Sequence, residues 1–439
     1  MHDKTADPGT SGARPAQPAE ARQGRTGAGQ VHQARLNTPG GVQPMRSIRR
    51  PVLAAAALTA VVALTATGCG PEGNQADGKP SQSADQGSAG GGGFTIPKDI
   101  QDKLKEHGVD LDKWKNGEWK NWDKDKWLRE ASEFINPIIK GLWDPDRASK
   151  AKPPKEPTPK DISGDQGRTD PEPRPVQAKA VKPPFGRNAP GLGKIFFDTP
   201  EGHAVCSGAV VKDPAHPGKS NLVWTAGHCV HAGKSGGWYR NMIFAPSFND
   251  SGKPAAQLER ATREEMFPKG VWWADGASTS NQWISQGGPQ GNSVPMAPYD
   301  FAIMHVTPEK GAGNKSLEEV AGGAYSVDFN ASAIPDISSI TAQGYPAEAP
   351  FDGSSLQQCT DKPGRLSLAA QKPTMYRIGC LMTAGSSGGP WFAKGSDGKP
   401  VLVSNTSIGP RPAGWLAGPH LGPEAKSMYG AMSKKFASQ

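Results

Sequence analysis

Hydrophobic residues are scarce in this chain, at 35% of 439 residues, whereas glycine and proline are abundant, at 55 and 42. This composition indicates long linkers beside a folded core. The apolar run at residues 52–64 is too short for a membrane-spanning helix, which needs roughly 20 apolar residues. Basic residues interleaved with aromatic ones are also lacking, although the net charge is +8. The composition therefore argues against a membrane-spanning helix and against a nucleic-acid groove.

Cysteine is rare as well, with five in the whole chain. Cys69 stands apart, and the other four form two plausible pairs, at Cys206, Cys229, Cys359 and Cys380. Persistent disulfides imply an oxidising compartment. The histidines at 203, 216 and 231 lie close in sequence, but their spacing matches no metal site. We therefore expect no metal and no cofactor.

The first 69 residues carry no sign of a folded unit. Residues 1–44 have no periodicity and are interpreted as a disordered or non-native extension. Residues 45–69 have basic residues, then the apolar run, then small residues before Cys69, which is the tripartite form of a signal peptide. Small residues before a lone cysteine resemble a bacterial lipobox. Lipid on Cys69 would place the protein on the outer face of a bacterial membrane.

Three segments of different composition follow. Residues 70–93 are a Gly/Ser-rich flexible linker. Residues 94–143 hold five tryptophans and an apolar stripe at helical spacing, which predicts a small helical module. The tryptophans favour a small core, and the alternative is a propeptide or a wall-contact module. Residues 144–183 are rich in Pro, Lys and Glu, which predicts a stiff extended tether.

From residue 184 to 439 the pattern changes to short β-rich runs between turns, at 194–197, 203–211, 221–225, 301–306, 339–345, 375–378, 390–393 and 401–408. Many short strands separated by Gly and Pro indicate an all-β barrel or sandwich. We therefore expect an all-β domain over 184–439.

The segment 383–390 places Ser387 among three glycines. A serine hydroxyl attacks a carbonyl only if a base takes its proton and donors receive the developing oxyanion. Glycines would let the chain turn tightly, so that the N–H groups of Gly385 and Ser387 converge on one point. The segment therefore predicts a nucleophile with its oxyanion hole.

Two further motifs supply partners for Ser387. His228 lies in the sequence Thr-Ala-Gly-His-Cys, and Asp300 in Tyr-Asp-Phe-Ala. The three motifs, in this order, resemble the trypsin/chymotrypsin-like serine peptidase superfamily. The resemblance implies two six-stranded antiparallel β-barrels with a His228–Asp300–Ser387 triad between them. The nucleophile elbow of α/β-hydrolases is disfavoured, because there the acid and the histidine follow the serine, and only His420 follows it here.

The resemblance also implies that Cys206 pairs with Cys229 beside the catalytic histidine, and that Cys359 pairs with Cys380. Ser386 stands where trypsins keep an aspartate that pairs with a new N-terminus, and in this the chain is closer to bacterial glutamyl endopeptidases. Leu381 replaces the acid that selects Arg and Lys, so that Leu381 and Met382 suggest an apolar or small pocket. We expect the strand at Ser404, Asn405 and Thr406 to bind the substrate main chain.

The gap between His228 and Asp300 is long and contains Trp272, Trp273 and Trp283, which predicts a loop that overhangs the cleft. These patterns together predict an exported, lipid-anchored, monomeric serine endopeptidase that acts on proteins or peptides. The alternative is a cell-surface binding protein whose peptidase-like domain no longer turns over.

Overall fold

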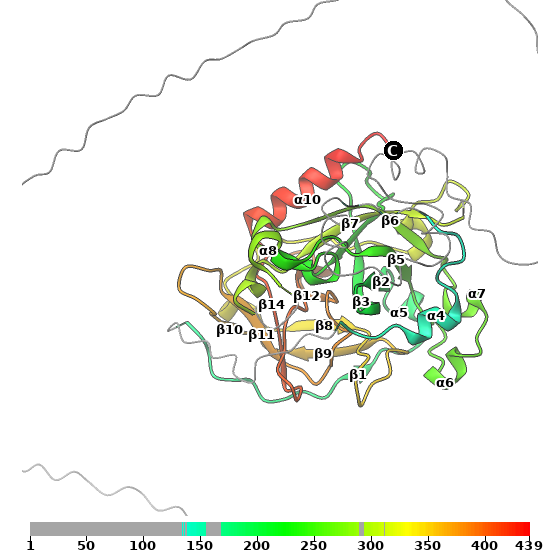
Figure 1. Ribbon diagram of the computed structural model, residues 1–439. Coiled ribbons are helices and arrows are strands. Elements are labelled where there is room, and N and C mark those ends of the chain that lie inside the picture. Colours follow the sequence, from blue (N-terminus) through cyan, green and yellow to red (C-terminus); the bar gives the residue numbers. More distant parts are fainter. Residues whose placement is uncertain (1–133, 135, 137, 155–167, 289–293, 311) are drawn as a thin grey trace, which may run out of the picture. The chain divides into compact units, whose positions relative to one another are not determined.

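The computed structural model describes residues 134, 136, 138–154, 168–288, 294–310 and 312–439 (Figure 1). The expected extension, signal peptide, Cys69, flexible linker and most of the Trp-rich module lie outside these residues. Within the described ranges no helix is long and apolar enough to cross a membrane.

Six antiparallel strands close into a barrel in the first half of the described domain. Around the barrel their order is β2, β3, β4, β7, β6, β5. Their bounds are Leu192–Thr199, Gly202–Val211, Leu222–Thr225, Ala302–Pro308, Trp272–Thr279 and Arg240–Pro246. Nearly every residue of β2 and β5 is buried, because side chains alternate between the barrel interior and an outer face that other segments cover.

Two further sheets form the second half. The five-stranded sheet has the order β1, β9, β8, β12, β13, with bounds Lys179–Ala180, Gln357–Asp361, Ile340–Gly344, Pro390–Lys394 and Pro400–Asn405. The three-stranded sheet joins β10, β11 and β14, at Gly364–Leu366, Met375–Gly379 and Trp415–Gly418. The all-β prediction and one closed barrel are confirmed. In the described residues the pairing of this half does not close a second barrel.

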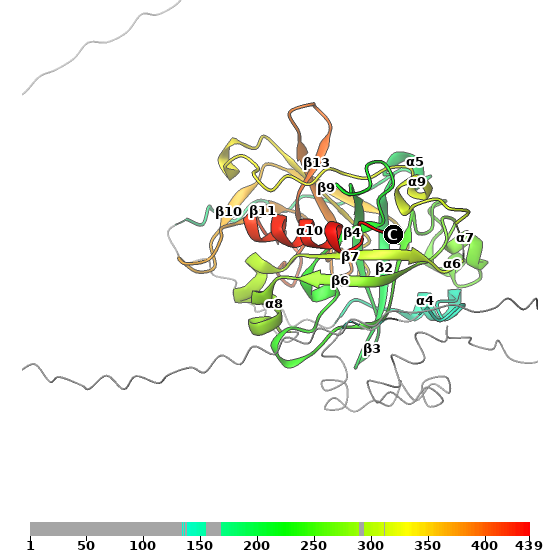
Figure 2. The same cartoon turned by 90° about the horizontal axis from the view of Figure 1, so that it is seen from above.

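The helices are short, apart from α10 at the C-terminus, Pro423–Lys435. It packs against β6 and β7 on the outside of the barrel (Figure 2). The other α-helices are α4 Pro145–Lys150, α5 Phe185–Asn188, α6 Ala255–Leu258, α7 Arg263–Met266, α8 Asn281–Gln286 and α9 Leu317–Ala321. Single 3-10 turns are η2 Gly227–Cys229, η3 Gly233–Ser235, η4 Val294–Tyr299 and η5 Ile334–Asp336.

The described residues before 184 are part of the packed domain. Asn136 bridges β5 and β6, because its side-chain amide donates to Met242 O and Ala274 O at 2.8 Å each. Trp143 is fully buried, and its indole N–H donates to Asn241 O at 2.6 Å. Further along the chain, Lys152 forms an isolated β-bridge with Ala204 of β3.

The segment 168–183 runs along the second half. Its strand β1 pairs with β9, and Asp170 forms an ion pair with Arg365 at 2.6 Å. The expectation of an extended tether over 144–183 is therefore wrong for the described parts of this range. Proline and lysine predicted an extended backbone, but an extended backbone can also pair with the edge of a sheet.

Candidate active site

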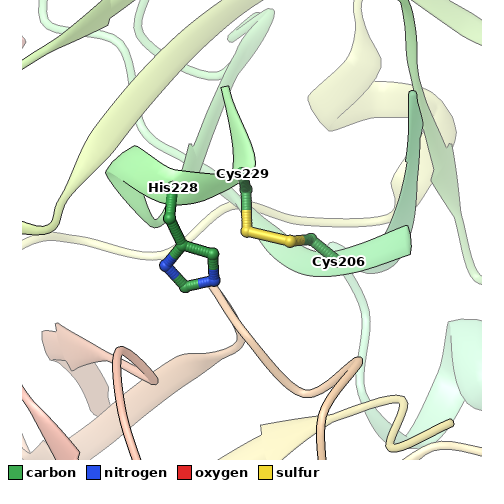
Figure 3. A group of neighbouring side chains, drawn as sticks. All are labelled: Cys206, His228 and Cys229. Carbon is green, nitrogen blue, oxygen red and sulfur yellow. A yellow bond between two sulfur atoms is a disulfide. The ribbon is translucent and has the colours of Figure 1, made fainter. Parts of the chain in front are cut away.

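His228 lies in η2, directly after strand β4. The turn is tight, because a Cβ on Gly227 would lie 2.6 Å from Thr279 Oγ1 and 3.0 Å from Asp300 Oδ1. Cys229 forms a disulfide with Cys206 of β3 (Figure 3). The predicted pairing is confirmed, and it holds the histidine turn against the barrel.

Asp300 is buried and faces His228. Its Oδ2 lies 2.7 Å from His228 Nδ1, and its Oδ1 accepts from the backbone N–H of His228 at 2.8 Å. Because Nδ1 donates to the carboxylate, Nε2 is the ring nitrogen that carries the lone pair in the neutral imidazole. The aspartate thus fixes both the ring orientation and its tautomer.

Ser407 is a member of this group that the sequence analysis missed. Its hydroxyl donates to Asp300 Oδ2 at 2.6 Å, although the two residues are 107 positions apart. Ser407 is buried and directly follows the predicted substrate strand. The only signal in the sequence is the run of polar residues there, at 404–407.

The loop that carries Ser387 requires its glycines. Gly385 and Gly388 have φ of 97° and 73°, which is a left-handed conformation that favours glycine. A Cβ on Gly388 would lie 2.0 Å from Thr225 Oγ1. Ser386 is buried, and its hydroxyl donates to Thr383 O at 2.7 Å. Ser387 is half-buried and lines the same cleft as His228.

The carbonyl oxygens of this loop have partners. Ala384 O accepts from Ala347 N–H at 2.7 Å, and Ser386 O accepts from Gly389 N–H at 2.9 Å. In a trans peptide the N–H points opposite to the C=O. These two bonds therefore fix the orientation of the N–H groups of Gly385 and Ser387. Neither N–H donates to a group among the described residues.

The cleft has a volume of about 370 Å³. Apart from His228 and Ser387, its walls include apolar side chains beside a short polar stretch. The residues on this side are Leu381, Met382, Thr406, Ser407, Ile408 and Leu416. The rim carries a pair of opposite charges, Arg411 and Glu348, at 2.9 Å. The lining residues thus offer a mainly apolar pocket next to the candidate nucleophile.

Two predicted substrate-binding residues do not reach this cleft. Ser404 and Asn405 are fully buried and are not among the described residues that line it. Asn405 instead accepts from Trp224 Nε1 and donates to Asp300 O, at 3.1 and 3.0 Å. Their backbones pair with β12. The stretch that faces the cleft therefore lies further along, at 406–409.

The three tryptophans between His228 and Asp300 do not form a loop over the cleft. Trp272 and Trp273 lie in β6 and are buried in the barrel. Trp283 of α8 is buried as well, with its ring 6.2 Å from that of His228. The prediction was wrong because this segment supplies barrel strands β5 and β6. Trp283 packs near the ring of His228 and is not among the described residues that line the cleft.

The remaining histidines have separate partners. His203 bonds to Asp198 and His216 to Asp213, at 2.7 and 2.9 Å. His231 Nδ1 accepts from Gly233 N–H at 2.9 Å, and burial lowers the pKa of His231 to about 4. Cys206, His228 and Cys229 place ligand-type atoms within 4.8 Å of one another. Both sulfurs are in the disulfide, so this group has no thiolate to offer a metal.

The second disulfide joins Cys359 of β9 to Cys380, which directly follows β11. This pairing was also predicted and is confirmed. Because Leu381 follows Cys380, the disulfide anchors the wall of the cleft that leads to the candidate nucleophile. Leu381 N–H also donates to Val176 O at 2.9 Å.

Comparison with known proteins gives matches among solved structures. No protein-family model matches the chain, and no curated protein matches it. The thermostable serine protease AL20 from an extremophilic microorganism is 30% identical; the match covers 56% of this chain and 98% of that one, with a TM-score of 0.44. The protease Anisep from Arthrobacter nicotinovorans is 29% identical, with coverages of 58% and 99% and a TM-score of 0.45. A Glu endopeptidase is 14% identical, with coverages of 61% and 99% and a TM-score of 0.41.

The chain has a trypsin-like serine peptidase fold, as its motifs predicted. Its own features carry this statement: the closed barrel, the disulfide beside His228 and the bond between His228 and Asp300. The matched structures are similar to it and are bacterial serine proteases or a glutamyl endopeptidase.

Proposed function

We propose that the protein is a serine endopeptidase with His228, Asp300 and Ser387 as its catalytic triad. The observation that carries the proposal is the cleft shared by Ser387 and a His228 whose Nδ1 is bound to the buried Asp300. A structural histidine needs neither a serine among left-handed glycines in the same cleft nor unused N–H groups next to that serine. The combination supports acyl transfer.

The proposed reaction has two halves. His228 Nε2 takes the proton of Ser387 Oγ as the oxygen attacks the scissile carbonyl, and the N–H groups of Gly385 and Ser387 stabilise the oxyanion. The tetrahedral intermediate expels the amine, which receives the proton from His228. Water then attacks the acyl-enzyme with the same base and restores Ser387. Asp300 stays ionised and stabilises the imidazolium that forms in each half.

The proposed substrates are proteins or peptides with an apolar residue before the scissile bond. Leu381, Met382 and Ile408 line the cleft, and a charged side chain buried among them would lose its hydration. The charged groups at the rim, Arg411 and Glu348, already pair with each other. His228 is the one histidine among the described lining residues, so these residues include no second histidine that could pair with a Glu side chain of the substrate. Turnover of peptide anilides with Leu or Phe at this position should exceed that of matched Arg and Glu substrates by at least about tenfold.

The proposed location is outside the cell, on a lipid anchor at Cys69. Two disulfides are typical of an oxidising compartment. The signal segment 45–69 supports export. The monomeric state expected from the sequence stays a proposal. Mass analysis of the mature protein for a diacylglycerol on Cys69 tests the anchor separately from the activity.

The triad is tested with a fluorophosphonate probe and casein on the full chain. Wild type should gain one probe at Ser387, and Ser387→Ala should lose labelling and more than about 10⁴-fold of casein hydrolysis. His228→Ala should also abolish labelling. A folded, oxidised protein without any Ser387-dependent reaction would favour the alternative, a surface binding protein with a peptidase-like domain.

A further inference from the structure

Ser207 lies at the point where the barrel meets the nucleophile loop. It follows Cys206 in β3, is buried, and has no place in the proposed triad. Its hydroxyl donates to Gly385 O at 2.9 Å and accepts from Tyr345 N–H at 2.9 Å. Its backbone N–H donates to Ser387 O at 2.7 Å. One residue therefore holds the nucleophile loop by both its backbone and its side chain.

We propose that Ser207 is a positioning residue for the oxyanion hole. Its hydroxyl holds the peptide between Gly385 and Ser386 so that the loop is ordered without a newly formed N-terminus. This inference rests on the proposed peptidase function, because it assigns a role within that same site.

The carbonyl partners of the loop show why this hydroxyl matters. Four successive carbonyls, those of residues 384–387, each accept a hydrogen bond. Three of the donors are backbone N–H groups, and only Gly385 O depends on a side chain. With φ at 97°, Gly385 is free to change conformation at little steric cost. Two bonds oppose rotation of this peptide: Ser386 N–H donates to Thr383 O at 3.3 Å, and the Ser207 hydroxyl makes the shorter bond, to Gly385 O at 2.9 Å.

The surroundings of the Ser207 hydroxyl are closely packed. A Cβ on Gly344 would lie 3.2 Å from Ser207 Oγ and 3.0 Å from Ser386 Cα. A water molecule needs space as well as two to four polar partners. Loss of the hydroxyl would remove the partner of both Gly385 O and Tyr345 N–H, and a water could replace it only within the space of the lost oxygen.

The side chain of Ser386 gives a second reason to assign this positioning role to Ser207. Its neutral hydroxyl bonds to Thr383 O within the same loop, so it has no charge to pair with an N-terminal ammonium group. Cys206 and Ser207 hold the two catalytic segments to the barrel instead. The disulfide of Cys206 holds the histidine turn to β3. The next residue of that strand, Ser207, holds the nucleophile loop through its bond to Gly385 O.

The test compares Ser207→Ala with Ser220→Ala in the full chain. Ser220 is a matched control, because it is buried and its hydroxyl also donates to a carbonyl, Val211 O, and accepts from a backbone N–H, that of Leu222. It does not line the cleft. Both variants should lose similar thermal stability, since each leaves two buried groups unpaired.

Only Ser207→Ala should lower kcat, by about 10- to 100-fold with KM within about threefold, because misplaced oxyanion donors act on the transition state. Its reaction with the fluorophosphonate probe should slow in parallel, and its affinity for a peptide aldehyde should fall more than its affinity for a product peptide. Ser220→Ala should keep kcat within about twofold.

Equal kcat values for the two variants would overturn the inference. If Ser207→Ala does not fold, Ser207→Cys keeps the shape of the side chain, at a slightly larger volume and with a weaker donor, and a wild-type kcat in that variant would have the same meaning. Ser387-dependent turnover in wild type beside a normal Ser207→Ala enzyme would reject only this inference. Absence of such turnover in wild type would remove both this inference and the proposed function.

Discussion

Asp300 illustrates how single residues are held in this site. A buried carboxylate is costly unless its oxygens accept hydrogen bonds. Here the donors are the backbone and Nδ1 of His228 and the hydroxyl of Ser407. Because every bond also restrains the imidazole or the loop beside it, the contacts that stabilise the charge are the ones that orient the proposed base.

Lys194 is a second buried charge, on strand β2. Its ammonium group donates to Gly353 O at 2.8 Å and lies 4.8 Å from the centre of the Phe248 ring. Burial lowers the pKa of Lys194 to about 7, and the nearby carboxylate of Asp352 opposes this shift. The bond to Gly353 holds the loop at 345–354. This loop also contains Ala347, whose N–H donates to Ala384 O.

We expect Lys194 to make stability depend on pH. Between about pH 7 and 10.5 the unfolded chain keeps a proton that the folded protein releases. The free energy of unfolding should therefore rise with pH in this window, by up to about 1.4 kcal/mol per pH unit. The difference between wild type and Lys194→Met in denaturant melts, from pH 7 to about 9.5, isolates this contribution. A flat difference would mean that the aromatic rings keep Lys194 protonated in the folded state.

At the scale of elements, the nucleophile loop depends on backbone space. Gly388 lies where the loop touches the end of β4, and its N–H donates to Thr406 O at 2.8 Å. A side chain there would meet Thr225 Oγ1 and Ser207 O, at 2.0 and 2.6 Å. The loop would have to move away from the barrel, and Ser387 would move with it.

Gly388→Ala should therefore lower kcat/KM by at least about 100-fold, because small displacements of reacting groups are costly. Gly430→Ala is the control, since a Cβ there meets nothing within 4 Å. Gly430 lies in α10, where alanine should raise the free energy of unfolding by about 0.5–1 kcal/mol. Kinetics and melting curves of both variants check this. Wild-type kinetics in Gly388→Ala would show that the loop adapts.

At the scale of the whole molecule, the described residues before 184 belong to the folded domain. The core that contains Phe196, Trp224 and Trp273 also includes Trp143. Arg147 of α4 forms an ion pair with the buried Asp198 at 2.5 Å. A propeptide covering all of 70–183 would take these contacts away when removed. We expect the active protein to retain the described residues from 138 onward.

Trp143→Ala tests this role. Removal of a fully buried tryptophan should lower the free energy of unfolding by about 3–5 kcal/mol. Lys150→Ala, in the adjacent helix with a side chain that is 66% exposed, should change it by less than about 0.5 kcal/mol. Urea melts of the full chain measure both. Similar values for the two variants, or an active natural form that begins near residue 184, would contradict the expectation.

The strands differed in how well the sequence predicted them. All eight β-rich runs identified in the sequence are strands in the structure, whereas β1, β5, β6, β9, β10 and β14 were missed. β6 contains Asp275 and Gly276 at a shift in the register, so polar residues interrupt its pattern. β14 is too short to show periodicity. Pairing in a sheet tolerates both features because neighbouring strands supply the hydrogen bonds.

The sequence by itself determined the residue types and the order of three motifs, and with them the candidate nucleophile, base and acid. These are local properties that side-chain chemistry and glycine spacing express directly. Tertiary structure decided which distant residues complete the site. Ser207 and Gly385 are 178 positions apart, and Trp143 and Asn241 are 98 apart. Such contacts depend on how strands close and segments pack, which no local pattern records.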